Sequence, residues 1–222
     1  MKQIVLDTET TGLSVKEGHR IVEIACIELE NLVKTENVFH NYLNPERKVS
    51  EKALDVHGYS DEFLSDKKKF KDIADDFLKF IEGKELIIHN ADFDIAHINN
   101  ELSIIGKKKI DKEYIIDTLE IARNKFPGAG LSLDALCKRF RIDNSRRIKH
   151  TAIIDCELLS KVYINLIDQK EPTLDFKPSI SLESNFKKDS KHDYCKRIIS
   201  ASPQEINLHK NFLEKKLKKN YF

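Results

Sequence analysis

Two carboxylates stand where an apolar run near the N-terminus ends. The run Ile4-Val5-Leu6 is rich in β-branched residues, which indicates a strand buried on both faces, and Asp7 and Glu9 follow it. Side chains alternate along a strand, so the two acids would project from one face and repel each other. A hard divalent cation, Mg²⁺ or Mn²⁺, takes carboxylate ligands and would compensate this repulsion. Such a pair on its own is more often a solvated strand end, so the motifs that follow have to decide.

Two later stretches combine histidine with aspartate. They are His89-Asn90-Ala91-Asp92-Phe93-Asp94 and His150-Thr151-Ala152-Ile153-Ile154-Asp155. Together with the run IVLDTETTGL at 4–13, they resemble, in the same order, the three motifs of the DEDD superfamily of 3′–5′ exonucleases. The H-x4-D spacing of the third motif is similar to the histidine branch of that superfamily.

The stretches between the motifs resemble a narrower group, the proofreading (epsilon) subunits of bacterial DNA polymerase III. This likeness is carried by VHG at 56–58, FPG at 126–128, SLDALC at 132–137 and IDNS at 142–145. It covers residues 1 to about 168, then weakens, and returns faintly near the C-terminus. Several motifs in the family's order are far more specific than any one of them alone.

The resemblance implies a metal site built from four acids. Asp92 and Asp94 compete for one position, and the family pattern places the ligand directly after Phe93, which selects Asp94. Asp92 is then an acid in the first turn of a helix, near the positive end of its dipole. The expected ligands of two divalent cations, Mg²⁺ or Mn²⁺, are Asp7, Glu9, Asp94 and Asp155. Two such cations would lie roughly 3.5–4 Å apart, one orienting a water and the other stabilising the departing 3′ oxygen.

His150 is the expected general base, because a neutral imidazole beside the metal site can take a proton from the attacking water. The expected contacts to the 3′-terminal nucleotide are the ligands Asp7, Glu9 and Asp155 together with His57, Leu13 and Phe93. Stacking and wedging by apolar side chains tolerate any base. His57 has the alternative interpretation of a structural turn histidine, and Phe93 that of a core residue. Lys52 departs from the epsilon pattern, which has an acid near the terminal sugar.

Predicted strands and helices place these motifs in an α/β fold. Alternation predicts strands at 20–30 and 37–43, joined by a polar link at 31–36, in a meander with the first strand. Apolar spacing predicts a helix at 71–81 that is stopped by Gly83. The other predicted elements are a short helix at 50–56, strands at 85–89 and 113–117, and helices from the second motif to about 105, at 118–125, 132–140 and 152–168. The resemblance implies a ribonuclease H-like mixed sheet flanked by helices.

Composition is consistent with a soluble protein of the cytoplasm. The 222 residues include 38 basic and 37 acidic side chains, so the formal charge is close to zero. No apolar run reaches transmembrane length, and no leader-like segment precedes the first acids. The four cysteines, Cys26, Cys137, Cys156 and Cys195, are widely separated, which suits a reducing compartment and argues against a zinc site or a disulfide framework.

The C-terminal part is predicted to differ from the body. We expect an exonuclease domain at 1–168, a flexible linker at 169–193 and a polymerase-docking segment at 194–222, forming a flexible tail. From Glu171 onward there are 11 Lys or Arg against 7 Asp or Glu. Ser202-Pro203-Gln204-Glu205 has the form of a capping box that opens a helix. By resemblance, this segment would bind the catalytic (alpha) subunit, and 171–176 would contact the sliding clamp, although Glu171 replaces the usual leading glutamine.

The predicted function is proofreading, by metal-dependent hydrolysis of mismatched 3′-terminal nucleotides from single-stranded or frayed DNA ends. One alternative keeps the chemistry and changes the substrate, namely a 3′ exoribonuclease that trims short RNAs or transfer RNA ends. An alternative of another class is a catalytically silent tethering module. The intact acids and His150 argue against a catalytically silent module, and the basic tail favours a polymerase subunit over a free ribonuclease.

Overall fold

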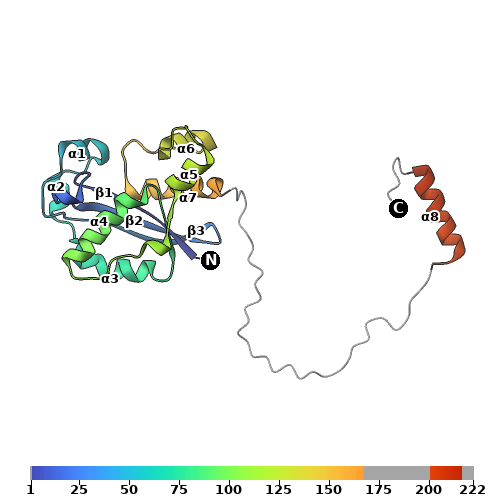
Figure 1. Ribbon diagram of the computed structural model, residues 1–222, viewed down its shortest axis with the longest axis horizontal. Coiled ribbons are helices and arrows are strands. Elements are labelled where there is room, and N and C mark those ends of the chain that lie inside the picture. The colour runs from blue at the N-terminus through green and yellow to red at the C-terminus, as the bar shows by residue number, and fades with distance from the viewer. Residues whose placement is uncertain (1, 168–200, 217–222) are drawn as a thin grey trace, which may run out of the picture. The chain divides into compact units, whose positions relative to one another are not determined.

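The computed structural model describes residues 2–167 and 201–216. The chain divides into two compact units, Met1–Phe176 and Lys177–Phe222. The first unit contains a five-stranded sheet with helices on both faces (Figure 1). The predicted linker at 169–193 lies outside the described residues. Within the described ranges, no helix has the length and apolar character needed to cross a membrane.

The sheet is mixed, and its strand order is β3-β2-β1-β4-β5. β1 pairs with β2, and β2 with β3, in antiparallel fashion, which confirms the predicted meander. β4 pairs in parallel with both β1 and β5. The strands are β1 (Lys2–Thr10), β2 (Ile21–Glu30), β3 (Val33–Tyr42), β4 (Glu85–Ile88) and β5 (Ile115–Asp117). The strand that carries the first two acids is therefore the centre of the sheet.

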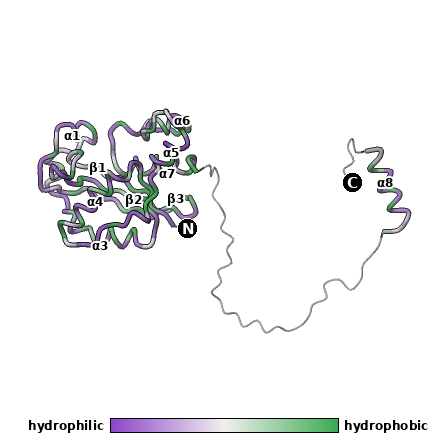
Figure 2. The backbone as a smooth tube through the Cα atoms, viewed as in Figure 1, coloured by the Kyte–Doolittle hydropathy of each residue, from purple (hydrophilic) through white to green (hydrophobic). Residues whose placement is uncertain are grey.

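Two apolar clusters cover the two faces of the sheet. Ile4 and Leu6 of β1 belong to the cluster that includes side chains of α3 (Phe70–Ile81) and α4 (Ala91–Ile104). Val5 points to the other face, where it joins α5 (Thr118–Lys125), α6 (Leu133–Phe140) and α7 (Ala152–Leu166). Hydrophobic stretches accordingly concentrate in the middle of the body (Figure 2). All three β1 residues are fully buried, as their sequence predicted. Cys26, Cys137 and Cys156 are also buried in these clusters.

The β2–β3 hairpin is tighter than predicted. Only Asn31 and Leu32 form the turn, and both have positive φ, at 50° and 66°. The polar residues Lys34, Thr35 and Glu36, predicted as a link, belong to β3. They fit there because β3 is an edge strand, where polar side chains can face solvent. The predicted strand at 113–117 is shorter for another reason, since Lys112–Tyr114 form a 3₁₀ turn before β5.

Short capped helices complete the body. α1 (Glu51–His57) confirms the predicted helix, with the Ser50 side chain accepting a hydrogen bond from the amide of Ala53. Gly58 ends it with a φ of 81°, a left-handed conformation that glycine adopts without strain. α2 (Asp61–Ser65) has no counterpart among the predicted elements, because five residues are too few to show helical periodicity.

The second unit is described only over residues 201–216 and contains α8 (Pro203–Lys216). The predicted capping box is confirmed. The Ser202 hydroxyl accepts from the Glu205 amide at 3.3 Å, and the Glu205 carboxylate accepts from the Ser202 amide at 2.8 Å. Three apolar side chains of α8, Ile206, Leu208 and Phe212, are exposed.

Candidate active site

The first motif lies at the C-terminal end of β1. Asp7 and Glu9 continue the alternation of Val5, so they point to the face of the sheet that α7 covers. Both acids are only half-buried, in contrast to the apolar run before them. Glu9 lies opposite Glu23 of β2 in the strand register, and the pairing shifts by one position just after it. The irregularity follows the last acid, so it leaves the common direction of the two carboxylates unchanged.

The start of α7 is anchored to this end of the sheet. The Glu23 carboxylate is buried between β2 and α7, and it accepts a hydrogen bond from the Ala152 amide at 2.9 Å. It also accepts from the ring nitrogen of His40 and from the hydroxyl of Tyr59, both at 2.7 Å. The amide of His150 donates to the carbonyl of Val56 at 3.2 Å, which ties the loop before α7 to α1. These contacts fix where the third motif sits relative to β1.

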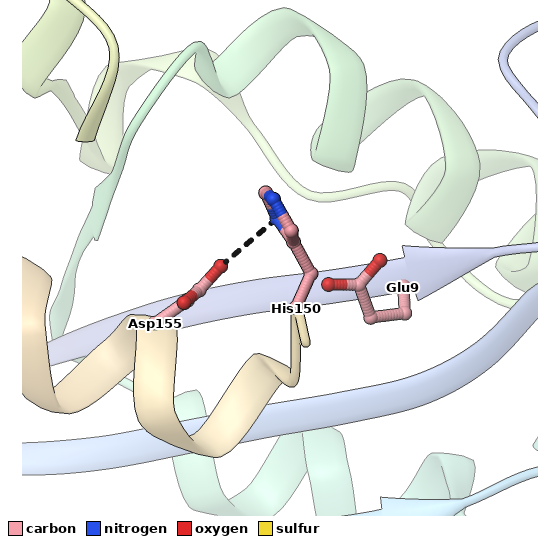
Figure 3. A group of neighbouring side chains, drawn as sticks. All are labelled: Glu9, His150 and Asp155. Atoms are coloured by element: carbon pink, nitrogen blue, oxygen red, sulfur yellow. Dashed lines mark ion pairs between the residues drawn. The ribbon is translucent and has the colours of Figure 1, made fainter. Parts of the chain in front are cut away.

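Glu9, His150 and Asp155 converge on one point (Figure 3). Their ligand atoms all lie within 4.8 Å of one another. Nδ1 of His150 is 3.5 Å from Oδ2 of Asp155, which is buried, whereas the imidazole is 45% exposed. Two carboxylates and an imidazole at this spacing are a donor set that fits a divalent cation. Asp7 and Asp94 are not members of this close group. The Asp94 charge nevertheless helps to raise the pKa of Glu9, and the charges of Glu9 and Asp155 help to raise the pKa of Asp7.

Asp94 is connected to the site by hydrogen bonds to Thr8 of β1. Its Oδ1 accepts from the Thr8 amide at 3.0 Å and from the Thr8 hydroxyl at 2.6 Å, and the side chain is buried. Asp92, two residues earlier in α4, is 85% exposed and pairs with Lys112 at 2.8 Å. The structure therefore turns Asp94 toward the other acids and Asp92 toward solvent, which is the arrangement expected from the sequence.

The site concentrates negative charge that is partly withdrawn from water. Burial, followed by the charges of Asp94, Asp155 and Glu9, raises the pKa of Asp7 well above its ordinary value. Burial and then the Asp155 charge raise the pKa of Glu9 to about 8. Burial raises the pKa of Asp94 to about 7, although the Thr8 hydrogen bonds oppose this shift. Acids that ionise this reluctantly next to one another favour a bound cation that offsets their repulsion.

Three residues that the sequence reasoning missed hold this arrangement. They are Thr8, Glu23 and Arg147. Arg147 forms a two-pronged ion pair with Asp155, from Nε to Oδ1 at 2.6 Å and from Nη2 to Oδ2 at 2.7 Å. Burial alone would raise the pKa of Asp155, but the hydrogen bonds and charge of Arg147 bring it below its ordinary value. The sequence carried a signal for two of them, because Glu23 is an acid inside an apolar predicted strand and Arg147 lies three residues before His150.

Four of the six expected substrate contacts line one cavity, whereas Asp7 and Asp155 do not belong to its lining. Its volume is about 520 Å³, and its lining includes Leu13, His57 and Phe93 together with Glu9 and Lys52. Leu13 is 83% exposed. His57 is buried, stacks on the Tyr59 ring at 4.9 Å between centroids, and accepts from the Tyr59 amide at 3.0 Å. The structure thus brings all three side chains to the edge of the acidic site, and it gives His57 structural contacts as well.

Comparison with known proteins decides the family. The family model described as "Exonuclease" matches residues 4–163. DNA polymerase III subunit epsilon of Rickettsia prowazekii (strain Madrid E) is 48% identical over 222 residues, covering 97% of this chain and 96% of the relative. The chain belongs to the DNA polymerase III epsilon-subunit family. The likeness in this epsilon relative continues beyond the exonuclease body, since it spans nearly the whole chain.

Solved structures agree with the fold of an epsilon-type exonuclease. Exonuclease X in complex with 5′ overhanging duplex DNA is 25% identical, with a TM-score of 0.59, covering 76% of this chain and 92% of that chain. The nuclease domain of 3′hExo, a DEDDh family member bound to rAMP, has a TM-score of 0.66 at 16% identity, covering 76% and 92%. The ribonuclease H-like mixed sheet and the family predicted from the sequence are therefore confirmed. The DEDDh exonucleases, the histidine branch, depend on divalent metal.

Proposed function

We propose that this chain is the proofreading 3′–5′ exonuclease subunit of a replicative DNA polymerase, and that it hydrolyses the last phosphodiester at a mismatched 3′ end. The observation that carries the proposal is the convergence of Glu9, His150 and Asp155 at the end of the central strand. Asp94 of α4 is hydrogen-bonded to Thr8 of the same strand, between Asp7 and Glu9. Membership in the epsilon family supports DNA as the substrate.

Each motif residue has a proposed role. Asp7, Glu9, Asp94 and Asp155 would hold two divalent cations, Mg²⁺ or Mn²⁺, which supply charge stabilisation and an activated water when bound. His150 would take the proton of that water, because its ring is partly exposed and next to Asp155. Its ligand atoms are also close enough to Glu9 and Asp155 for direct metal binding, so the two roles need to be distinguished by experiment.

The neighbouring cavity is the proposed site of the terminal nucleotide. Leu13 and Phe93 would pack on the terminal base and sugar, and His57 would lie near the phosphate. The cavity, of about 520 Å³, would receive the terminal nucleotide of a single strand. A mismatch has already lost part of its pairing and stacking, so less free energy is needed to fray it into the cavity. This difference is the proposed physical basis of proofreading.

The tail is the proposed attachment to the polymerase. Residues 194–222 would bind the catalytic (alpha) subunit, with 169–193 as the linker that joins them to the exonuclease domain at 1–168. The exposed apolar side chains of α8 and its complete N-terminal cap suit a helix that packs against a partner. A tether of this kind keeps the exonuclease at high effective concentration near the primer end. Residues 171–176 would contact the sliding clamp, and the complex would act in the cytoplasm.

The decisive experiment compares matched and mismatched DNA primers, with single-stranded RNA as a third substrate. We expect Mn²⁺- or Mg²⁺-dependent release of nucleoside monophosphates, fastest from mismatched DNA and abolished by a chelator or by Asp7→Ala. Equal rates on matched and mismatched ends together with a preference for RNA would instead support the 3′ exoribonuclease alternative. An absence of hydrolysis on every substrate would support the tethering module.

Two further variants test the base and the tail. His150→Ala should lower turnover by roughly 10²–10⁴-fold and leave Mn²⁺ affinity intact. Loss of Mn²⁺ affinity together with turnover would make His150 a ligand. The exposed His209 of α8 offers a matched control, since His209→Ala should leave hydrolysis unchanged. Truncation after residue 168 should preserve hydrolysis of free single strands and reduce co-purification with the catalytic subunit. Retained co-purification would place the docking surface on the exonuclease body.

A further inference from the structure

The side chain of Arg147 is hydrogen-bonded to side-chain atoms that the proposed hydrolysis would use. It lies in the loop before α7, and its side chain is 7% exposed. Two of its nitrogens take both oxygens of Asp155, at 2.6 and 2.7 Å. Nη2 also lies 2.8 Å from Nδ1 of His150, and Nη1 donates to Asp134 at 2.5 Å. All three guanidinium nitrogens therefore have partners, and two of those partners are a proposed metal ligand and the proposed base.

The contact with His150 has a fixed direction. A guanidinium group carries only donors, so Nδ1 of His150 must be the acceptor. The lone pair of that nitrogen therefore points to Arg147, whose side chain covers it. The same reasoning applies to Asp155, because a cation that approaches this carboxylate meets a positive charge already bound to both of its oxygens. Arg147 and a divalent cation thus need the same partners.

The rest of the site shows why a positive charge belongs there. Asp7, Glu9 and Asp155 repel one another, and burial of such a group without a countercharge is costly. Asp134, on α6 and 52% exposed, binds the third guanidinium nitrogen, Nη1. The neighbouring Arg146 has no comparable role, since it is 81% exposed and 3.9 Å from Glu157.

We propose that Arg147 is an internal cation that competes with divalent metal for Asp155 and covers Nδ1 of His150 until metal binds. The residue would set how tightly the site binds metal and would keep the base covered when metal is scarce. This inference rests on the proposed exonuclease function, and it concerns the metal affinity of the site. A purely structural role for Arg147 makes the opposite prediction, because loss of a residue that merely orients Asp155 would weaken metal binding.

Calorimetric titration of the chelator-treated, full-length chain with Mn²⁺ tests the proposal. Removal of one positive charge beside a divalent cation should tighten Mn²⁺ binding by roughly tenfold or more in Arg147→Gln. Arg147→Lys keeps the charge and loses the two-pronged geometry, so its affinity should stay within about threefold of the unmodified chain. Arg146→Gln is the matched control, with the same change of charge at an exposed position, and should also stay within about threefold.

Unchanged or weaker Mn²⁺ binding in Arg147→Gln would overturn the proposal and make Arg147 a support for Asp155. If that variant does not fold, Asp134→Asn carries the test, because it loosens the guanidinium without touching a proposed ligand. Tighter Mn²⁺ binding in Asp134→Asn supports competition, and unchanged or weaker binding refutes it. An unmodified chain that binds no Mn²⁺ would contradict the proposed function itself, whatever the variants do.

Discussion

Asp94→Asn should make the chelator-treated protein more stable at alkaline pH and should inactivate it. Both hydrogen bonds from Thr8 end on Oδ1 of Asp94, and an asparagine can keep them while placing its amide at the other position. The change therefore removes a buried negative charge with little change of shape. It also removes an expected metal ligand, so stability and function should move in opposite directions.

The size of the effect follows from the pKa of Asp94, which burial raises from 3.8 to about 7. This rise in pKa corresponds to about 4 kcal/mol. Because the folded state binds this proton more tightly than the unfolded chain, its contribution to stability is fully present below about pH 4 and is lost as the pH rises through about 7. Asparagine cannot ionise, so at about pH 8 the variant should gain up to about 4 kcal/mol over the unmodified chain.

Urea unfolding in chelator, between about pH 4 and pH 8, measures this difference. The two proteins should have similar free energies of unfolding at the acidic end and diverge as the pH rises. Added Mn²⁺ should stabilise the unmodified chain and have less effect on Asp94→Asn. Asp92→Asn is the control, since Asp92 is 85% exposed and its ion pair with Lys112 is screened by solvent. A variant that is less stable than the unmodified chain at alkaline pH in chelator would refute the argument from burial and repulsion.

Three further substitutions test other contacts of the site. Thr8→Val removes a hydroxyl donor 2.6 Å from Asp94. A hydrogen bond to a charged acceptor is worth roughly 1.5–3 kcal/mol, so its loss should shift half-maximal Mn²⁺ binding to higher pH in calorimetry. An unchanged pH profile of Mn²⁺ binding would contradict this role of Thr8. Gly12→Ala would place its Cβ 2.3 Å from Cε1 of His19, a clash at the wall of the nucleotide cavity that the ring must move to relieve. KM for a single-stranded oligonucleotide should therefore rise while the protein still folds. Glu23→Gln replaces one acceptor oxygen by a donor beside the first amide of α7 and should lower the free energy of unfolding by roughly 1–3 kcal/mol together with turnover. Full turnover in Glu23→Gln would show that this anchor does not position the third motif.

Local patterns determined a large part of this molecule. The period of two along a strand placed Asp7 and Glu9 on one face, and the apolar run before them predicted the buried centre of the sheet. Side-chain caps and helical spacing gave α1, α3 and the start of α8, because these signals involve residues within a few positions of each other. The order of the three motifs was enough to predict the family.

Tertiary structure alone decided which residues support the acids. Thr8 bonds Asp94 across 86 positions of sequence, and Glu23 holds the start of α7 across 129. No periodicity links residues so far apart, since their contact depends on how α4 and α7 pack on opposite faces of the sheet. The pairing of Arg147 with Asp155 is nearer in sequence, but its direction is set by a loop that has no repeating geometry. The sequence was enough to predict the groups that carry the chemistry, whereas packing determined the neighbours that control their charge. The physical reason is that the charge of a side chain in a folded protein depends on burial and on contacts that only the assembled layers create.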